Sequence, residues 1–194
     1  MEITNIRDHR IRWSVLFAQG ALAGITSAVL MLAIATITYP AFADGADGWT
    51  FMKVVSSSVL GDGAASPLAG FDALPVLLGL VIHFALGAFA GVTYAGLVAM
   101  FDLEGWTPVA LFGLLYGAML FVWSTALIGA GFGGAAIQGL PLIVMFWGNM
   151  AFGLTSGILL ATWADGADID QVESERISVF EGDADQPALR HSLH

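Results

Sequence analysis

Cysteine is absent from this chain of 194 residues, and lysine occurs only once, at Lys53. The absence of cysteine excludes disulfide bonds, thiolate metal sites and cysteine nucleophiles. Charged residues are also scarce, at 11% of the sequence, whereas an ordinary soluble domain has roughly 25%. Hydrophobic residues make up 57%, and the mean hydropathy is +0.80. This composition indicates an integral membrane protein.

Four apolar runs are long enough to cross a bilayer, since about 20 helical residues span its hydrocarbon core. They cover residues 15–39, 73–101, 108–132 and 140–163. Because a bilayer offers no water to the backbone, each run must make its hydrogen bonds internally. We therefore predict an all-α fold, an integral membrane four-helix bundle formed by residues 15–163.

The basic residues before the first run predict the orientation of the chain. Arg7, Arg10 and Arg12 precede the run, so the positive-inside rule places the N-terminus in the cytoplasm. The alternative is a cleaved signal peptide, because residues 41–43 read A-F-A. The run of about 25 residues exceeds a typical signal-peptide core, which favours an uncleaved span. We predict a multi-pass protein of the cell membrane with both termini cytoplasmic.

Each of the four runs contains two glycines in the spacing G-x-x-x-G. Residues four apart share one face of a helix, and glycine on that face lets two backbones approach closely. Such ridges serve contacts inside one chain or between chains. The sequence therefore allows a homo-oligomer or a larger membrane complex as well as a single folded chain. The predicted packing residues are Gly20, Gly24, Gly87, Gly91, Gly113, Gly117, Gly153 and Gly157.

The second and fourth runs share the pattern L-P-x7-[H/N]-x-A-x-G-x3-G, in which His83 corresponds to Asn149. The first and third runs match less closely, with Gly20 aligned to Gly117. Since both hairpins begin and end on the same side, the sequence predicts two parallel helical-hairpin repeats related by an axis along the membrane normal. His83 and Asn149 would then lie at a similar depth.

A resemblance is carried by H-F-A-L-G-x3-G-x2-Y at residues 83–94, its echo at 149–157, and G-A-L-A-G at 20–24. The chain resembles a family of uncharacterised four-span membrane proteins common in salt-loving archaea, with bacterial relatives. The resemblance covers roughly residues 15–160 and implies a fold but no activity. A histidine is common in that family at the position of Asn149, so a pair of histidines does not carry over to this chain.

His83 is the only strongly ionisable side chain deep in a predicted span. Ionisable residues inside membranes are costly and often functional, so His83 could handle protons, contact a ligand or bind one metal or haem. The alternative is a neutral imidazole hydrogen-bonded to Asn149, a serine or a backbone carbonyl. We favour the structural role because polar contacts between membrane helices are modest in strength. The other polar candidates are Gln19, Ser124, Thr125, Asn149 and Ser156.

No catalytic residue, metal site or cofactor is predicted. His9, His191 and His194 belong to the predicted cytoplasmic ends, and no second metal-ligating group lies at the depth of His83. A nucleophile with a nearby base is also missing from the spans. The glycine-rich residues 129–139 lack the lysine and the serine or threonine of a phosphate-binding loop.

Two further segments lie outside the runs. Residues 49–60 are amphipathic, which predicts an extracytoplasmic helix that lies on the surface or caps the bundle. Its expected apolar side is Trp49, Phe51, Met52, Val55 and Val59, with Thr50, Lys53 and Ser57 opposite.

The C-terminal residues 164–194 contain eight acids and two arginines, which predicts a disordered cytoplasmic tail that repels nucleic acid. Such acidic, lysine-poor composition is typical of proteins from very salty cytoplasm, where salt screens the repulsion. An acidic tail that binds a partner is the alternative.

The leading functional expectation is a non-catalytic packing or accessory subunit of a membrane assembly. The alternative is a small solute or ion transporter, or a channel-like protein, that uses the level of His83 and Asn149. An enzyme or haem carrier is least favoured. A polar cavity at His83 open to one side would favour transport, whereas a dry and fully packed centre would favour the subunit.

Overall fold

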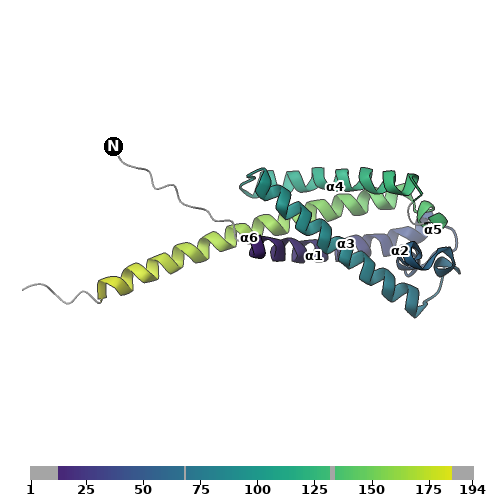
Figure 1. Ribbon diagram of the computed structural model, residues 1–194, viewed down its shortest axis with the longest axis horizontal. Coiled ribbons are helices and arrows are strands. Elements are labelled where there is room, and N and C mark those ends of the chain that lie inside the picture. Colours follow the sequence, from purple (N-terminus) through teal and green to yellow (C-terminus); the bar gives the residue numbers. More distant parts are fainter. Residues whose placement is uncertain (1–12, 68, 132–133, 185–194) are drawn as a thin grey trace, which may run out of the picture.

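The structure is a computed structural model that describes residues 13–67, 69–131 and 134–184. All regular secondary structure in these ranges is helical, which confirms the predicted all-α class. The elements in chain order are α1 (Trp13–Phe42), α2 (Thr50–Leu60), the 3-10 helix η1 (Asp62–Ala65), α3 (Ala73–Met100), α4 (Trp106–Gly129), α5 (Gly134–Gln138) and α6 (Leu142–Ala184) (Figure 1).

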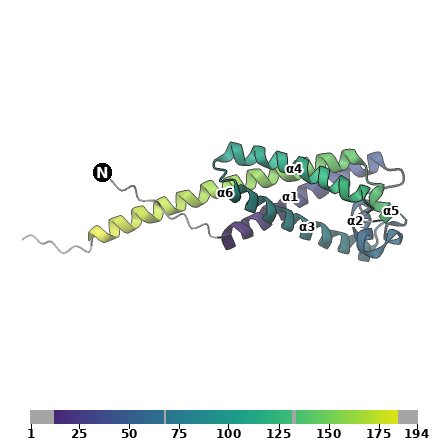
Figure 2. The same ribbon diagram turned by 45° about the horizontal axis from the view of Figure 1, so that its top comes forward.

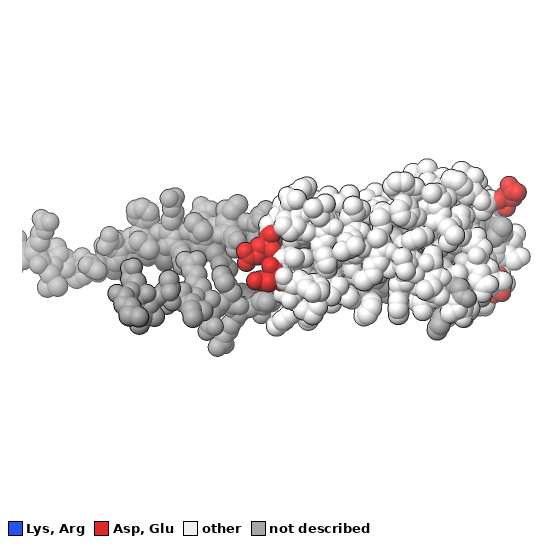
Figure 3. Space-filling view, turned by 90° about the horizontal axis from the view of Figure 1, so that it is seen from above, with Lys and Arg blue, Asp and Glu red and all other residues white. Residues whose placement is uncertain are grey.

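Four of these helices are long and apolar enough to cross a membrane, as predicted. The spans are Trp13–Ala41, Ala73–Met100, Trp106–Ile128 and Leu142–Trp163. On the face shown in Figure 3, the described acidic side chains gather at the two ends of the bundle and the stretch between them is uncharged. The chain is therefore a multi-pass membrane protein. Arg7, Arg10 and Arg12, which predicted its orientation, lie outside the described residues.

The bundle has two different ends, and Figures 1 and 2 agree on their composition. One end carries α2, η1 and α5, and we call it the cap end. The opposite end carries the start of α1, the turn between α3 and α4, and the continuation of α6, and we call it the tail end. Helix α1 packs against α3, and α4 against α6, so the bundle consists of two helical hairpins.

Glycine ridges join α1 to α3 in the first hairpin. A Cβ atom at Gly24 would lie 2.1 Å from the carbonyl oxygen of Gly87. A Cβ atom at Gly91 would lie 2.1 Å from the carbonyl oxygen of Gly20. Side-chain carbons do not approach backbone atoms this closely, so the absence of a Cβ is what allows the two helices to touch.

The same arrangement joins α4 to α6 in the second hairpin. A Cβ atom would lie 2.2 Å from the Gly113 carbonyl oxygen if placed at Gly153, and 2.4 Å from the Gly153 carbonyl oxygen if placed at Gly113. Gly117 and Gly157 also face the partner helix. All eight glycines of the G-x-x-x-G pairs thus lie in contacts inside one chain.

These contacts correct the sequence alignment of the first and third spans. Gly24 lies between Gly87 and Gly91, and Gly113 lies in the same way between Gly153 and Gly157. Gly24 is therefore the counterpart of Gly113, and Gly20 is not the counterpart of Gly117. Glycine-rich helices match at several registers that differ by whole turns, so the sequence alone did not distinguish them.

A two-fold axis does not relate the two hairpins. A two-fold axis would make the contact between α3 and α4 equivalent to the contact between α1 and α6. Helix α1 packs closely on α6, where the Ser156 hydroxyl donates to the Ser27 hydroxyl over 2.9 Å. Helices α3 and α4 instead meet mainly near the turn that joins them and diverge toward the cap end (Figure 1).

An aromatic cluster fixes α3 to α4 at the tail end. The Tyr94 and Tyr116 ring centroids are 5.2 Å apart, and Phe112 stacks on Tyr94 at 5.9 Å. The Tyr94 hydroxyl donates to the Val109 carbonyl, and the Tyr116 hydroxyl donates to the Ala90 carbonyl over 2.8 Å. Buried hydroxyls that find carbonyl acceptors remove the cost of desolvation and orient the rings. From this cluster toward the cap end, α3 and α4 diverge (Figure 1).

At the cap end, α2 packs tightly against α3. A Cβ atom at Gly79 would lie 2.0 Å from the Met52 carbonyl oxygen. Of the two predicted alternatives, the structure therefore favours a helix that caps the bundle over one that lies on its surface.

The predicted sides of α2 were wrong. Lys53, expected on the exposed side, is only 2% exposed, whereas Trp49 and Val59 are 47% and 68% exposed. The cause is the loop after α2, which folds back so that the Lys53 ammonium donates to the Pro67 carbonyl.

Asp47 organises the turn that leads into α2. Its carboxylate accepts hydrogen bonds from the backbone N–H groups of Trp49, Thr50 and Gly70, at 2.9, 3.1 and 2.6 Å, and from the Thr50 hydroxyl. Burial raises the pKa of Asp47, but these hydrogen bonds outweigh it and hold the pKa below its ordinary value of 3.8. Since Gly70 is 23 residues away, Asp47 also ties the loop after η1 to the start of α2.

We expect Asp47→Ala to destabilise the protein by about 1–2 kcal/mol at neutral pH, because capping carboxylates contribute about that much. The matched control is Asp44→Ala, which removes the same charge from an exposed residue. Thermal unfolding in detergent measures both. The folded-state pKa of Asp47 is lowered, so its contribution is complete above pH 3.8 and is lost as the pH falls through the folded value. An equal loss in both variants would contradict this role.

Helix α6 continues beyond the candidate fourth span, which ends at Trp163. Helix α6 ends at Ala184, whereas the sequence predicted a disordered tail from residue 164. Disorder was inferred because acidic residues cannot bury apolar surface. A helix that is already nucleated avoids the cost of starting one, so extension needs no core of its own. Residues 185–194 lie outside the described residues.

Candidate functional site

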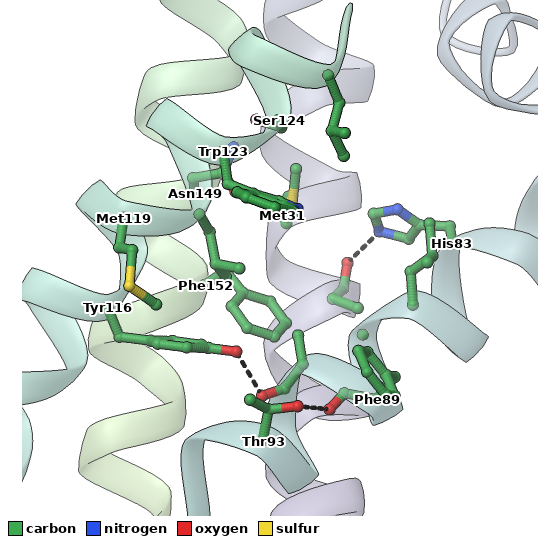
Figure 4. A pocket seen from close by; sticks show the side chains of 16 residues that line it. Met31, His83, Phe89, Thr93, Tyr116, Met119, Trp123, Ser124, Asn149 and Phe152 are labelled. Atoms are coloured by element: carbon green, nitrogen blue, oxygen red, sulfur yellow. Dashed lines mark hydrogen bonds between the residues drawn. The ribbon is translucent and has the colours of Figure 1, made fainter. Parts of the chain in front are cut away.

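A cavity of about 490 Å³ lies between the two hairpins, where α3 and α4 diverge. Helices α3 and α4 form its walls, and residues of α1 and α6 line it between them. The aromatic cluster bounds it toward the tail end, since Tyr116 is among the lining residues. His83 and Asn149, the two predicted site residues, both line this cavity and face it from different helices (Figure 4).

His83 is held by a backbone carbonyl rather than by another side chain. Its Nε2 atom lies 2.9 Å from the Ala28 oxygen in α1, and the residue is 7% exposed. A carbonyl oxygen only accepts, so Nε2 carries the hydrogen and donates. In the neutral ring Nδ1 is then an acceptor. The rings of Phe51 in α2 and Phe84 stand edge-on to the imidazole, with centroids 5.8 and 5.7 Å away.

Asn149 is held in a similar way on the opposite hairpin. Its side-chain nitrogen donates to the Met145 carbonyl over 2.8 Å, one turn earlier in α6, and the residue is 8% exposed. This bond assigns the other amide atom as the oxygen, which accepts no hydrogen bond from the described residues. His83 and Asn149 therefore share a cavity without bonding each other. The sequence left three possible partners for His83: Asn149, a serine or a backbone carbonyl. In the structure the partner is the Ala28 backbone carbonyl.

The hydroxyl groups around the cavity already donate to the backbone. Thr93 donates to the Phe89 carbonyl, Ser124 to the Phe121 carbonyl, and Tyr116 to the Ala90 carbonyl. The bonds of Thr93 and Ser124 stay within one helix, which is usual for hydroxyls in membrane helices, whereas Tyr116 bonds from α4 to α3. The remaining lining is apolar except for the indole N–H of Trp123: Ala28, Met31, Leu86, Gly87, Phe89, Ala90, Met119, Leu120, Trp123, Leu127 and Phe152.

Two acceptor atoms are left over in this apolar setting. Nδ1 of His83 and the side-chain oxygen of Asn149 have no hydrogen-bond partner among the described residues. No fully enclosed side-chain nitrogen or oxygen in the described structure lacks a partner. Both acceptors therefore keep some accessible surface, and both residues line the cavity.

The other predicted polar candidates lie elsewhere or are satisfied. Thr125 donates to backbone carbonyls of its own helix, and Gln19 is half-buried near the tail end. Ser156 bonds Ser27 at the junction of the hairpins, and both residues are fully buried. Ser27 was missed by the sequence analysis. A usable signal existed, because Ser27 continues the glycine ridge of α1 at helical spacing after Gly24.

No group of three metal-ligating side chains occurs within the described residues. The remaining histidines of the chain, His9, His191 and His194, lie outside them. The described cavity thus offers one imidazole, one carboxamide, one indole N–H and three hydroxyls that already donate to carbonyls, in a wall that is otherwise aliphatic and aromatic. Comparisons with protein-family models, with curated proteins and with solved structures found no match to this chain.

Proposed function

We propose that this protein is a non-catalytic integral membrane protein that binds a lipid-like molecule between its two hairpins. The observation that carries the proposal is the cavity of about 490 Å³ at the level of His83 and Asn149. Its volume falls within the roughly 300–1,000 Å³ of small-molecule sites, which combine apolar walls with a few polar groups. Any role as an accessory subunit of a membrane assembly would then include holding this molecule.

The opening of the cavity supports a ligand that arrives from the bilayer. Several lining residues are strongly exposed at the protein surface, among them Phe89 at 72%, Trp123 at 64% and Leu86 at 61%. They belong to α3 and α4, whose flanks would face lipid in a four-span bundle. A molecule dissolved in the hydrocarbon core can therefore enter sideways between the helices without first crossing into water.

The lining argues against an ion or a hydrophilic solute. Moving such a solute into hydrocarbon requires polar groups that replace its water, because unpaired polar groups are costly there. In the described cavity only His83, Asn149 and Trp123 have a side-chain polar atom without a hydrogen-bond partner. The site also differs from the dry, packed centre that would have favoured a purely structural subunit. An apolar molecule with little hydrogen-bonding demand fits this lining best.

We also propose that the tail end faces the cytoplasm. The support is the three arginines before α1, which begins at the tail end. The cap end with α2, η1 and α5 would then lie on the outer side.

We expect Leu120→Trp to displace the bound molecule, because Leu120 lines the cavity and tryptophan adds bulk there. The matched control is Leu115→Trp, which makes the same change on α4 at a residue that is 64% exposed and outside the cavity. Native mass spectrometry after mild detergent extraction measures bound lipid-like molecules. We expect them on wild type and Leu115→Trp, and at least tenfold less on Leu120→Trp. Equal occupancy of both variants would contradict the proposal.

A further inference from the structure

We infer that the bound molecule is a lipid-like alcohol or phenol whose hydroxyl group donates a hydrogen bond to Nδ1 of His83. The inference rests on the proposed function and specifies the chemistry of its ligand. It follows from the hydrogen-bonding state of the groups that surround the cavity.

The first step is the state of His83. Because Nε2 donates to the Ala28 carbonyl, the neutral ring presents only an acceptor at Nδ1. The residue is more than nine-tenths buried, so this lone pair has little access to water. An acceptor left unpaired in an apolar environment costs free energy that a donor would recover. The site therefore favours a molecule that brings one donor.

The second step is the rest of the lining. The hydroxyls of Thr93, Ser124 and Tyr116 all donate to carbonyl groups, so none of them donates a hydrogen bond to Nδ1 of His83. Asn149 also has a free oxygen and so adds a second acceptor to the cavity. The two acceptors favour a ligand that brings a donor, while the indole N–H of Trp123, which has no partner among the described residues, can donate to the oxygen of such a ligand. An ether, an ester or a hydrocarbon lacks that donor, and a hydroxyl group supplies it.

The third step is the distribution of polarity. Apart from the acceptors of His83 and Asn149, the indole N–H of Trp123 is the one further polar group of the described lining without a partner, and the rest of the wall is aliphatic, aromatic or already hydrogen-bonded. Phe89, Met119 and Trp123 continue this apolar surface to the exposed flanks of α3 and α4. The matching ligand has a single hydroxyl on an apolar body. A glycerophospholipid headgroup, with its charges, does not match.

Hexadecan-1-ol and hexadecyl methyl ether are suitable probes because the ether replaces the hydroxyl hydrogen by a methyl group. The purified full chain is incubated with an equimolar mixture in detergent, and native mass spectrometry gives the bound ratio. We expect wild type to hold about tenfold more alcohol than ether, the effect of one good hydrogen bond. His83→Leu should bring the ratio close to one. Thr125→Ala should keep it, because Thr125 does not line the cavity and its hydroxyl donates to carbonyls of its own helix.

A second measurement on wild type avoids dependence on a variant that fails to fold. In ¹⁵N-histidine-labelled protein, the alcohol should shift the Nδ1 resonance of His83 and the ether should not. Equal binding of both probes, or a preference that survives in His83→Leu, would overturn the inference and leave the proposed function intact. Failure of both probes to bind wild type would overturn both. A dimer that loses its partner in Leu120→Trp would also overturn both, since a second copy would then fill the cavity.

Discussion

Replacing Gly91 by alanine is expected to disrupt the first hairpin, whereas replacing Gly96 on the same helix should leave it intact. The new Cβ at Gly91 would lie 2.1 Å from the Gly20 carbonyl oxygen, and backbone cannot move aside as a flexible side chain can. Overpacking typically costs about 1–3 kcal/mol, and a clash with backbone should fall at or above the top of that range. A Cβ at Gly96 would meet nothing within 4 Å.

The two substitutions make the same chemical change on α3, so their difference isolates the contact with α1. Alanine favours helix by up to about 1 kcal/mol over glycine, so Gly96→Ala should be neutral or stabilising. Thermal unfolding in detergent, followed by circular dichroism, measures both. Comparable melting temperatures for the two variants would show that α1 and α3 do not touch along the glycine ridge. Gly153→Ala in the second hairpin should resemble Gly91→Ala, because its Cβ would lie equally close to backbone, at 2.2 Å from the Gly113 carbonyl oxygen.

The helices and their packing faces could be predicted because both depend on local sequence. A run of apolar residues determines a membrane span, and a four-residue spacing places two glycines on one face. The register between helices is a tertiary property. Gly20 matched Gly117 in the sequence because the pattern repeats with the helical turn, and only the contacts of Gly24 and Gly113 distinguish the alternatives.

The candidate site was predictable in part. The repeat that aligned His83 with Asn149 indicated two polar groups at one level, and both line a single cavity. The cavity itself was not predictable, because it exists where α3 and α4 diverge while α1 and α6 stay packed. The hydrogen bond from His83 to the Ala28 carbonyl could not be predicted either, since every residue has a backbone carbonyl that can accept. Helical periodicity misplaced the buried side of α2, because it cannot predict the loop that covers Lys53.

The closest approach between cap and bundle leads to the second large expected effect. We expect Gly79→Ala to release α2 from α3, because its Cβ would lie 2.0 Å from the Met52 carbonyl oxygen. The glycine ridges lie further along α3, at Gly87 and Gly91, so the hairpins should remain assembled. Hydrogen exchange should show α2 amides exchanging at least tenfold faster, which corresponds to about 1.4 kcal/mol of lost protection. Amides of α4 and α6 should keep their rates.

The control for this variant is Gly63→Ala in η1, where a new Cβ would meet nothing within 4 Å and α2 should stay protected. Unchanged exchange in α2 of Gly79→Ala would show that the cap does not depend on this contact. Release of α2 has a further consequence, because the Phe51 ring stands 5.8 Å from the imidazole of His83. Loss of that neighbour would admit water to the ring, and water competes with a ligand hydroxyl for Nδ1. The preference for alcohol over ether should therefore fall in Gly79→Ala and persist in Gly63→Ala, although neither variant alters a residue that lines the cavity.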